Sequence, residues 1–324
     1  MIKWGIIGPG AIAHKFANEV YNTEKGELIS VYGRNEERVK SFAKEYDLAS
    51  YYTNIDEFLN SKEIDAVYIA TPHSNHREFA IKAINAGKHI LCEKPFSYNY
   101  ETSKEIIELA KEKNVFVMEA LWTLFLPAVK KAKSWIEEGK IGKIKMITAN
   151  FGFKSEEDIN SRLYNPELAG GALLDVGIYT ILISNFITND LPVAINASAI
   201  MTRTKVDETD LISLKYSNEE VAALTCSIAC ETDKSTVIYG ERGRVLLPAF
   251  WSAKEAYLYD NEGLLEEYYD SYEGEGYKYE IEEANNCILT NKMESETASH
   301  KTTLELAKIM DEVRNQINLV YPFE

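Results

Sequence analysis

The amino-acid sequence predicts an α/β protein of two domains. The first is a doubly wound parallel sheet, and the second is an α+β domain with a large open, mostly antiparallel sheet. Over residues 1–120, short apolar runs alternate with segments of helical periodicity, as in a parallel sheet covered on both faces. After about residue 190, strand-like segments follow one another without helices, which favours antiparallel pairing. A chain of 324 residues is also long enough for two domains.

The elements of the first domain follow from its apolar runs. We expect strands at 2–7, 28–32, 66–70, 89–92 and 115–118. Helical periodicity indicates helices at 11–21, 36–46, 75–86 and 100–114. Right-handed crossovers between these strands make the sheet doubly wound.

The second domain, residues 121–324, begins with helices and continues with strands. We expect helices at 127–138 and 171–186, with a strand at 144–153. Further strands are expected at 193–201, 211–216, 221–229, 235–239, 244–247 and 256–259. The stretch 266–280, rich in Tyr, Glu and Gly, is interpreted as a surface loop, and helices at 279–290 and 302–316 close the chain.

Composition excludes several classes of function. A formal net charge of −16 argues against nucleic acid and anionic membrane surfaces as partners. We see no run of about 18 apolar residues and no signal-peptide pattern, so we expect a cytoplasmic protein. The cysteines lack zinc-ligand spacing, so we expect buried free thiols and no metal site; they are Cys92, Cys226, Cys230 and Cys287.

A glycine-rich turn follows the first predicted strand. Residues 8–13 read Gly-Pro-Gly-Ala-Ile-Ala and open the first predicted helix, which is the context of a dinucleotide-binding turn in a Rossmann fold. Gly8 permits the tight turn, Gly10 lets the backbone approach a pyrophosphate, and Ala13 lets the helix lie close to the sheet. The expected phosphate-binding residues are Gly8, Gly10, Ala11, Ile12 and Ala13.

The end of the second strand bears on the choice of cofactor. NAD-binding sheets usually carry an acid there for the ribose 2′-hydroxyl. This chain has Gly33 followed by Arg34, with Arg38 one helical turn later. Because arginine can pair with a 2′-phosphate, we expect NADP(H) to be preferred, with NAD(H) possible.

Two further stretches resemble the Gfo/Idh/MocA oxidoreductase family. The first comprises Ala-Thr-Pro-His-Ser-Asn-His at 70–76 with Ala-Gly-Lys-His-Ile-Leu-Cys-Glu-Lys-Pro at 86–95. The second is Gly-Gly-Ala-Leu-Leu-Asp-Val-Gly-Ile-Tyr at 170–179. The resemblance covers nearly the whole chain. It is strongest to the branch of dimeric dihydrodiol dehydrogenases and NADP-dependent xylose dehydrogenases.

This resemblance implies roles for individual residues. Lys94 matches the family's catalytic lysine, which in that family often precedes a cis proline peptide, and Asp175 and Tyr179 match its substrate-binding and acid–base positions. The remaining cofactor contacts implied are Thr71, Pro72, His73, Asn75, His76 and Glu93, with Lys94 itself. Substrate contacts are expected from Trp122, Phe151, Arg162 and Trp251. Leu124 stands where the branch often has arginine, so substrate preference is expected to differ from that branch.

The residue types suit oxidation of a secondary alcohol. Asp175 and Tyr179 are four apart on a predicted helix and therefore share a face. Such a reaction needs a hydride acceptor and a base for the hydroxyl proton. We expect Tyr179 to be the acid–base, Lys94 its activator and oxyanion donor, and Asp175 an orienting group. An alternative is that Lys94 itself relays the proton.

The leading hypothesis is therefore an NADP-dependent oxidoreductase acting on an aldose or a cyclic diol. An NAD-dependent inositol- or glucoside-type dehydrogenase is the alternative enzyme, although such relatives usually carry histidine where this chain has Tyr179. A cofactor-binding regulator without catalysis is the alternative of another class. Apolar strands in the second domain also predict a homodimer formed through its sheet.

Overall fold

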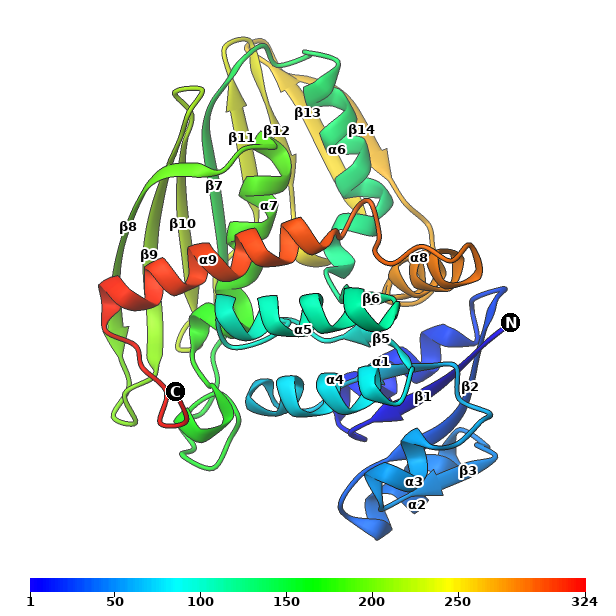
Figure 1. Cartoon of the computed structure of the whole chain (residues 1–324). Helices are drawn as coiled ribbons and strands as arrows, with labels where there is room; N and C mark the ends of the chain where they lie inside the picture. Colours follow the sequence, from blue (N-terminus) through cyan, green and yellow to red (C-terminus); the bar gives the residue numbers. More distant parts are fainter. The chain divides into compact units, whose positions relative to one another are not determined.

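The computed structural model describes residues 1–324, and they form two compact units (Figure 1). The first unit comprises Met1–Trp122 with Glu273–Leu304, and the second comprises Thr123–Tyr272 with Glu305–Glu324. The chain leaves the first unit close to the division expected from the sequence. One segment, Glu273–Leu304, belongs to the first unit although the sequence placed it in the second domain.

The reason for that difference lies in the contacts of helix α8 (Lys278–Leu289). The helix packs against α1 and β1, the first elements of the chain. There the indole Nε1 of Trp4 donates to Asn285 Oδ1 at 2.8 Å. Glu19 accepts backbone hydrogen bonds from Glu275 and Lys278 at the start of α8. These contacts join residues more than 250 positions apart, so no local pattern in the sequence reports them.

The sheet of the first unit has six parallel strands in the order β3-β2-β1-β4-β5-β6. Its strands are β1 (Ile2–Ile7), β2 (Gly26–Tyr32), β3 (Ser50–Tyr52), β4 (Ala66–Ile69), β5 (His89–Cys92) and β6 (Val117–Glu119). Its helices before α8 are α1 (Ala11–Val20), α2 (Glu36–Glu45), α3 (Ile55–Leu59), α4 (His76–Asn85) and α5 (Tyr100–Lys113). The strand order reverses at β1, which confirms the doubly wound fold; β3 and α3 are additions that the sequence pattern did not indicate.

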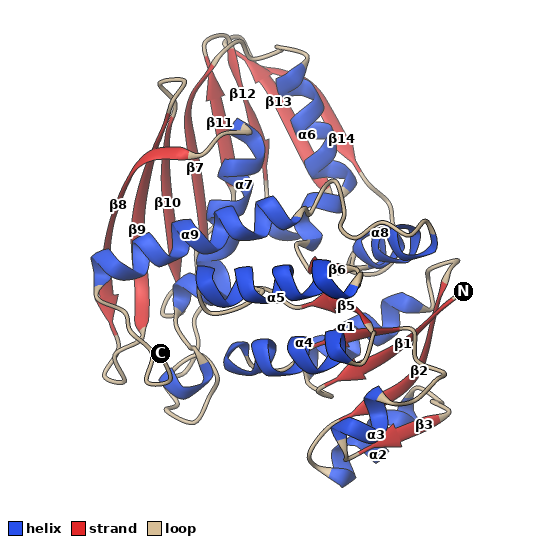
Figure 2. Cartoon of the chain, viewed as in Figure 1, coloured by secondary structure: helices blue, strands red, loops and turns tan.

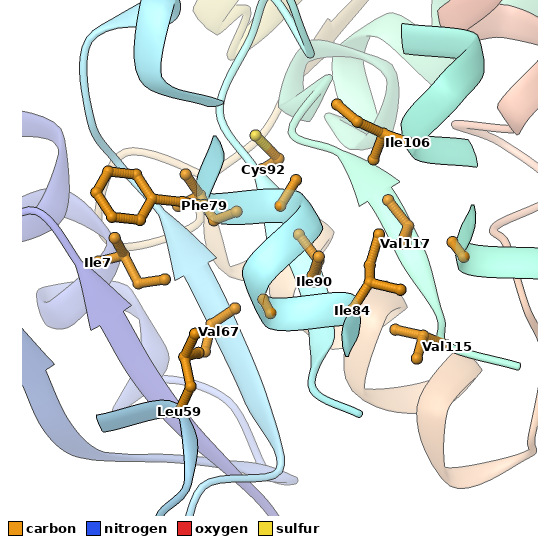
Figure 3. Packing of buried hydrophobic residues seen from close by; sticks show 14 of the residues in the cluster. Ile7, Leu59, Val67, Phe79, Ile84, Ile90, Cys92, Ile106, Val115 and Val117 are labelled. Atoms are coloured by element: carbon orange, nitrogen blue, oxygen red, sulfur yellow. The ribbon is translucent and has the colours of Figure 1, made fainter. Parts of the chain in front are cut away.

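The core of this unit explains why its strands read as continuous apolar runs. In register across the sheet, Val67 lies beside Ile90, and Ile7 lies beside Ile69. Figure 3 shows these strands covered by apolar side chains from α4 and α5, among them Phe79 and Ile106. Because helices cover the strands, no polar alternation is needed along them.

The second unit contains an eight-stranded sheet in the order β14-β13-β12-β11-β7-β10-β9-β8. Its strands are β7 (Ile144–Gly152), β8 (Pro192–Met201), β9 (Asp207–Tyr216), β10 (Val221–Ser227), β11 (Thr236–Gly240), β12 (Gly243–Leu247), β13 (Glu255–Asp260) and β14 (Leu264–Tyr269). Only β7 and β10 pair in parallel, so the expected mostly antiparallel sheet is confirmed. The interpretation of residues 266–280 as a surface loop is partly wrong, because β14, which ends at Tyr269, pairs with β13.

Helices cover one face of this sheet (Figure 2). They are α6 (Pro127–Glu137), α7 (Ile178–Thr188) and the second-unit part of α9 (His300–Ile317). Along β9 and β10 the inward residues are buried, whereas Leu211 and Val221 on the opposite face are 56% and 44% exposed. Within the second unit, no helix covers that opposite face, and we call it the open face of the sheet.

One helical stretch, Pro166–Thr188, reaches the length and hydropathy of a membrane-spanning segment, with a mean hydropathy of 1.5 over its best window. The sequence pattern did not single it out. In the structure 89% of that window is buried inside the protein, which is how the core helix of a folded domain behaves.

Candidate active site

The turn between β1 and α1 has the conformation that its glycines were expected to permit. Gly8 has φ +99°, and its N–H donates to the Tyr32 carbonyl at 2.9 Å. A Cβ at Gly8 would lie 3.0 Å from Thr71 Cγ2, so the turn passes close to the end of β4. Any larger residue at position 8 would combine backbone strain with crowding.

The start of α1 fits a bound pyrophosphate. No side chain caps this helix, and Gly10 precedes its first residue. A Cβ at Gly10 would have only the Ala70 carbonyl within contact distance, at 3.8 Å, so the backbone there is open to a ligand. The neighbouring Thr71 Oγ1 is buried and makes no hydrogen bond within the protein. Uncapped amides beside an unpartnered hydroxyl suit phosphate oxygens, so the residues present fit a dinucleotide.

The end of β2 has no room for an acidic side chain at Gly33. A Cβ there would come within 2.8 Å of both Pro9 Cδ and Val39 Cγ1. Arg34, the next residue, is exposed. Arg38 lies against the glycine turn, with its guanidinium 3.4 Å from the Pro9 carbonyl. Arg38 therefore belongs to the surroundings of the turn, and Arg34 follows Gly33, which lies against Pro9 of the turn.

His76 holds two loops of the first unit together. Its ring nitrogens lie 2.9 Å from the carbonyl oxygens of Thr71 and Pro95. Burial lowers the pKa of His76, and the two carbonyl contacts partly offset that shift. Both ring nitrogens are thus engaged by the backbone, whereas a direct cofactor contact was expected. His73 packs edge-on against this ring, with centroids 5.8 Å apart.

Lys94 follows β5, and its bond to Pro95 is a cis peptide, as the family resemblance implied. The preceding Glu93 is nearly buried. Its carboxylate accepts hydrogen bonds from the hydroxyl of Tyr68 and from the backbone N–H of Lys94. Glu93 therefore anchors the peptide that carries Lys94, which is a supporting role in addition to the expected cofactor contact.

Two more carboxyl groups are buried near Glu93. Glu119 accepts the N–H of Phe96 at 2.8 Å, and burial raises its pKa to about 7. Glu280, on α8, is fully buried, and neither of its oxygens has a hydrogen-bond partner. Burial, followed by the charge of Glu93, raises the pKa of Glu280 well above its ordinary value. Burial without a hydrogen-bond partner disfavours the ionised form of Glu280.

The start of the Asp175–Tyr179 helix differs from the regular helix that was expected. Residues Leu173–Gly177 form a π-helical turn, and α7 begins only at Ile178. Such turns occur frequently at functional sites. Asp175 is buried and receives two hydrogen bonds from the Arg162 guanidinium, at 2.8 and 3.3 Å. This bidentate pair fixes the carboxylate of Asp175.

Aromatic rings surround Tyr179 in the second unit. Phe151, at the end of β7, lies 5.5 Å from the Tyr179 ring and 4.5 Å from the Trp251 ring, between centroids. Trp251 also has the ammonium group of Lys234 over its face at 5.8 Å. Four expected site residues therefore lie in one part of this unit: Phe151, Asp175, Tyr179 and Trp251, with Arg162 attached through Asp175.

Trp122 and Leu124 are both buried. Trp122 is buried in the first unit and stacks on Tyr277, with centroids 4.3 Å apart and planes 17° apart. Leu124 is 1% exposed in the second unit. An arginine there would bury a charge and would need a partner. Sequence reasoning missed Tyr68 and Glu280, because their significance depends on neighbours distant in the chain.

Comparison with known proteins agrees with this geometry. The model of the oxidoreductase family with an NAD-binding Rossmann fold matches residues 2–121, and the model of the GFO/IDH/MocA C-terminal domain matches residues 129–246. The chain is 32% identical to a trans-1,2-dihydrobenzene-1,2-diol dehydrogenase of Danio rerio, covering 99% of this chain and 98% of the relative. It is also 32% identical to scyllo-inositol 2-dehydrogenase (NADP(+)) IolU of Bacillus subtilis, covering 99% of both.

Solved structures share the fold at lower identity. An aldose-aldose oxidoreductase from Caulobacter crescentus, complexed with glycerol, superposes with a TM-score of 0.89 at 20% identity, covering 98% of this chain and 97% of that one. Both halves of the chain thus match the same family, and the glycine turn, the Glu-Lys-Pro loop and the Asp-Tyr helix occupy the expected elements. The chain belongs to the Gfo/Idh/MocA family of NAD(P)-dependent oxidoreductases, and it is a dehydrogenase that acts on CH–OH groups.

Proposed function

We propose that the protein is an NADP-dependent dehydrogenase of an aldose or a cyclic diol. The observation that carries the proposal is the Arg162-held carboxylate of Asp175 four residues before Tyr179, whose ring lies among aromatic side chains. A fixed carboxylate accepts hydroxyl hydrogen bonds, and aromatic rings pack against the apolar face of a sugar or diol ring. Relatives named for a dihydrodiol and for scyllo-inositol support a ring with neighbouring hydroxyl groups.

The chemistry divides between the cofactor and this chain's residues. When bound, the nicotinamide supplies the acceptor for the hydride that leaves the substrate carbon. As the C=O bond forms, Tyr179 in its phenolate form takes the hydroxyl proton and becomes a neutral phenol, while the Lys94 ammonium stabilises the negative charge developing on the oxygen. Asp175 accepts a hydrogen bond from a second hydroxyl and so orients the ring. In the reductive direction Tyr179 returns the proton.

The preference for NADP(H) rests on the arginines beside the glycine turn. Gly33 leaves no space for the acid that binds a ribose 2′-hydroxyl, and Arg34 and Arg38 supply positive charge in the same region. We expect Arg34→Ala to weaken NADPH binding by about ten- to a hundred-fold, as for loss of a charged hydrogen bond. NADH binding, which lacks the 2′-phosphate, should hardly change.

Fluorescence titration with NADPH and NADH, followed by turnover with aldoses, inositols and cyclic diols, tests the proposal. Lys94→Ala should abolish turnover while retaining cofactor binding, and Tyr179→Phe should lower kcat by about a hundred-fold or more. Lys62→Ala, which removes an exposed lysine of the same unit, is the matched control. Turnover that survives Lys94→Ala would contradict the assigned roles. A preference for NADH would contradict the arginine argument alone.

We further propose that the protein is a cytoplasmic homodimer joined through the open face of the second-unit sheet. That face carries exposed apolar residues, including Ile200, Leu211 and Val221, between small ones such as Ala223. Flat rows of this kind suit sheet-to-sheet packing in an isologous dimer. The four cysteines are all free, which supports a reducing compartment. Cell fractionation with antibody detection tests the location.

A further inference from the structure

Two buried carboxyl groups of β9 lie outside the chemistry described above. Asp207 and Asp210 are both 0% exposed, and they lie close enough together for the charge of Asp207 to act on Asp210. Two ionised carboxylates held near each other and away from water repel, so one of the two keeps its proton. Neither Oδ1 atom has a hydrogen-bond partner elsewhere in the protein, so no donor offsets a second negative charge. The pair therefore holds one proton.

Asp207 binds the backbone at the start of the π-helical turn. Its carboxylate accepts hydrogen bonds from the N–H groups of Ala172 and Leu173. Gly171, with φ +119°, lies directly against it, because a Cβ there would be 2.0 Å from Asp207 Oδ1. A negative charge at the beginning of a helical segment is favourable. Asp207 thus fixes the segment that leads to Asp175.

Asp210 is the partner that carries the proton. It is supported by the Cys226 thiol, whose Sγ donates to Asp210 Oδ2 at 3.0 Å. Burial, followed by the charge of Asp207, raises the pKa of Asp210 to about 9. Cys226 also touches the turn itself, since a Cβ at Gly177 would lie 2.9 Å from its Sγ. Both ends of the π-helical turn therefore rest on this cluster.

The C-terminal tail completes the surroundings. The buried Tyr321 donates its hydroxyl to the Gly170 carbonyl at 2.8 Å, and burial, followed by the charge of Asp207, raises the pKa of that hydroxyl. Arg314, from α9, lies over the Tyr321 ring at 4.7 Å and pairs with Glu324. The titratable and charged groups around the pair are thus Cys226, Tyr321, Arg314 and Glu324.

We propose that Asp207 and Asp210 share one proton and act as positioning residues that hold the Asp175–Tyr179 turn in its working geometry. The functional part of this proposal rests on the proposed function of that turn. The structural part, a shared proton that protects the turn, can be tested without a substrate.

The test compares Asp207→Asn with Asp210→Asn. Asparagine at 210 can donate to Asp207 and accept from Cys226, so it imitates the protonated acid. At pH 7 we expect Asp210→Asn to keep the amide hydrogen exchange of residues 171–179 within about two-fold of wild type. At pH 10 wild type, having lost the proton, should exchange about ten-fold faster than Asp210→Asn. Asp207→Asn should accelerate exchange there about ten-fold already at pH 7.

Turnover and infrared spectra supply independent readouts. We expect Asp207→Asn to lower kcat with the NADPH Kd unchanged, and Asp210→Asn to retain kcat as the conservative rescue. If Asp207→Asn does not fold, infrared spectroscopy tests the shared proton. The difference spectrum between wild type and Asp210→Asn at pH 8 should then contain the band of one protonated carboxyl group. Absence of that band, or equal loss of protection in both variants, would overturn the proposal. Absence of turnover in wild type would count against the proposed function alone.

Discussion

Several glutamates are buried in the interior of the first unit. Glu93, Glu119 and Glu280 all lie in the interior, and the carboxylate of Glu93 accepts hydrogen bonds from Tyr68 and from the backbone of Lys94. Burial raises the pKa of Glu119 to about 7 and raises the pKa of Glu280 well above its ordinary value. The three acids therefore differ in how readily they ionise, and Glu93 is the one bonded to the Lys94 peptide.

Glu119 should make the stability of the protein depend on pH. Its pKa is about 7 in the folded state and ordinary in the unfolded state, so the folded protein retains a proton that the unfolded chain loses. The free energy of unfolding should therefore fall as pH rises from about 4.5 to 7 and level off above that. Glutamine cannot ionise, so Glu119→Gln removes the loss of stability at high pH. The variant should be more stable than wild type by about 3 kcal/mol at pH 8 and equal to it near pH 4. Urea unfolding across this range measures the difference; a gap independent of pH would refute the assignment.

Tyr68 should affect catalysis through Glu93. Tyr68→Phe removes a hydroxyl that donates to the Glu93 carboxylate, and we expect about 1.5–3 kcal/mol of lost stability. The loosened Lys94 peptide should lower kcat by about ten-fold while NADPH binding is unchanged. Tyr216→Phe is the matched control, since it also removes a buried hydroxyl, bonded to Ser184 and Asn185 in the second unit. If both variants lower kcat equally, Tyr68 has only a structural role.

Among the elements, the turn before α7 depends most on its neighbours. A regular helix through residues 171–186 would satisfy the sequence pattern, but the structure inserts the π-helical turn Leu173–Gly177. The widened turn fits its surroundings: Asp207 accepts amide hydrogen bonds at its start, and Gly177 lies against Cys226. Asp175 lies within this turn and Tyr179 just after it, so their placement depends on strands β9 and β10.

A comparison of substitutions at Gly171 and Gly139 separates the energetic cost of crowding from the cost of backbone strain. Both have positive φ, at +119° and +73°, but only Gly171 has an atom close to its missing Cβ. Gly139→Ala should cost about 1–2 kcal/mol, the penalty for a side chain in the left-handed region. Gly171→Ala should cost clearly more, above about 3 kcal/mol, because it also displaces the Asp207 carboxylate. Chemical denaturation compares the two, and equal losses would show that Asp207 can move away without penalty.

For the whole molecule, the open sheet face is the surface that most needs a partner. The strands bury their side chains on one side of the sheet only. On the other side apolar area remains in contact with water, at Leu211, Val221 and Ile200. The net charge of −16 opposes nonspecific association, so a specific self-complementary contact is the arrangement we expect.

Light scattering should therefore give twice the chain mass of 36.7 kDa. Ala223→Arg places a charge in the middle of the open face and should shift the protein to monomer. Ala49→Arg, at an exposed position of the first unit, should remain dimeric and serves as the control. A wild-type mass equal to one chain, or an unchanged mass for Ala223→Arg, would count against this interface.

The sequence by itself determined the two-part architecture, the glycine turn and the family, because these depend on local periodicity and on residues adjacent in the chain. Apolar runs such as 66–70 and 89–92 predicted β4 and β5, and Gly8 predicted the tight turn, in which its φ is +99°. The strongest site prediction made from the sequence, the Glu93–Lys94 pair after β5, also depends on residues adjacent in the chain. The proposed roles of Lys94, Asp175 and Tyr179 remain predictions until the variants are measured.

Only the tertiary structure decided which distant groups support those residues. Helix α8 belongs with β1 through Trp4 and Asn285, and the π-helical turn begins at a hydrogen bond to the buried Asp207 of β9. The pKa of a carboxyl group depends on what surrounds it in space, and in this fold those neighbours come from strands and tails far along the chain. A single sequence contains the residues but not their juxtaposition, which is why Asp207, Asp210 and Glu280 read as ordinary acids until the chain is folded.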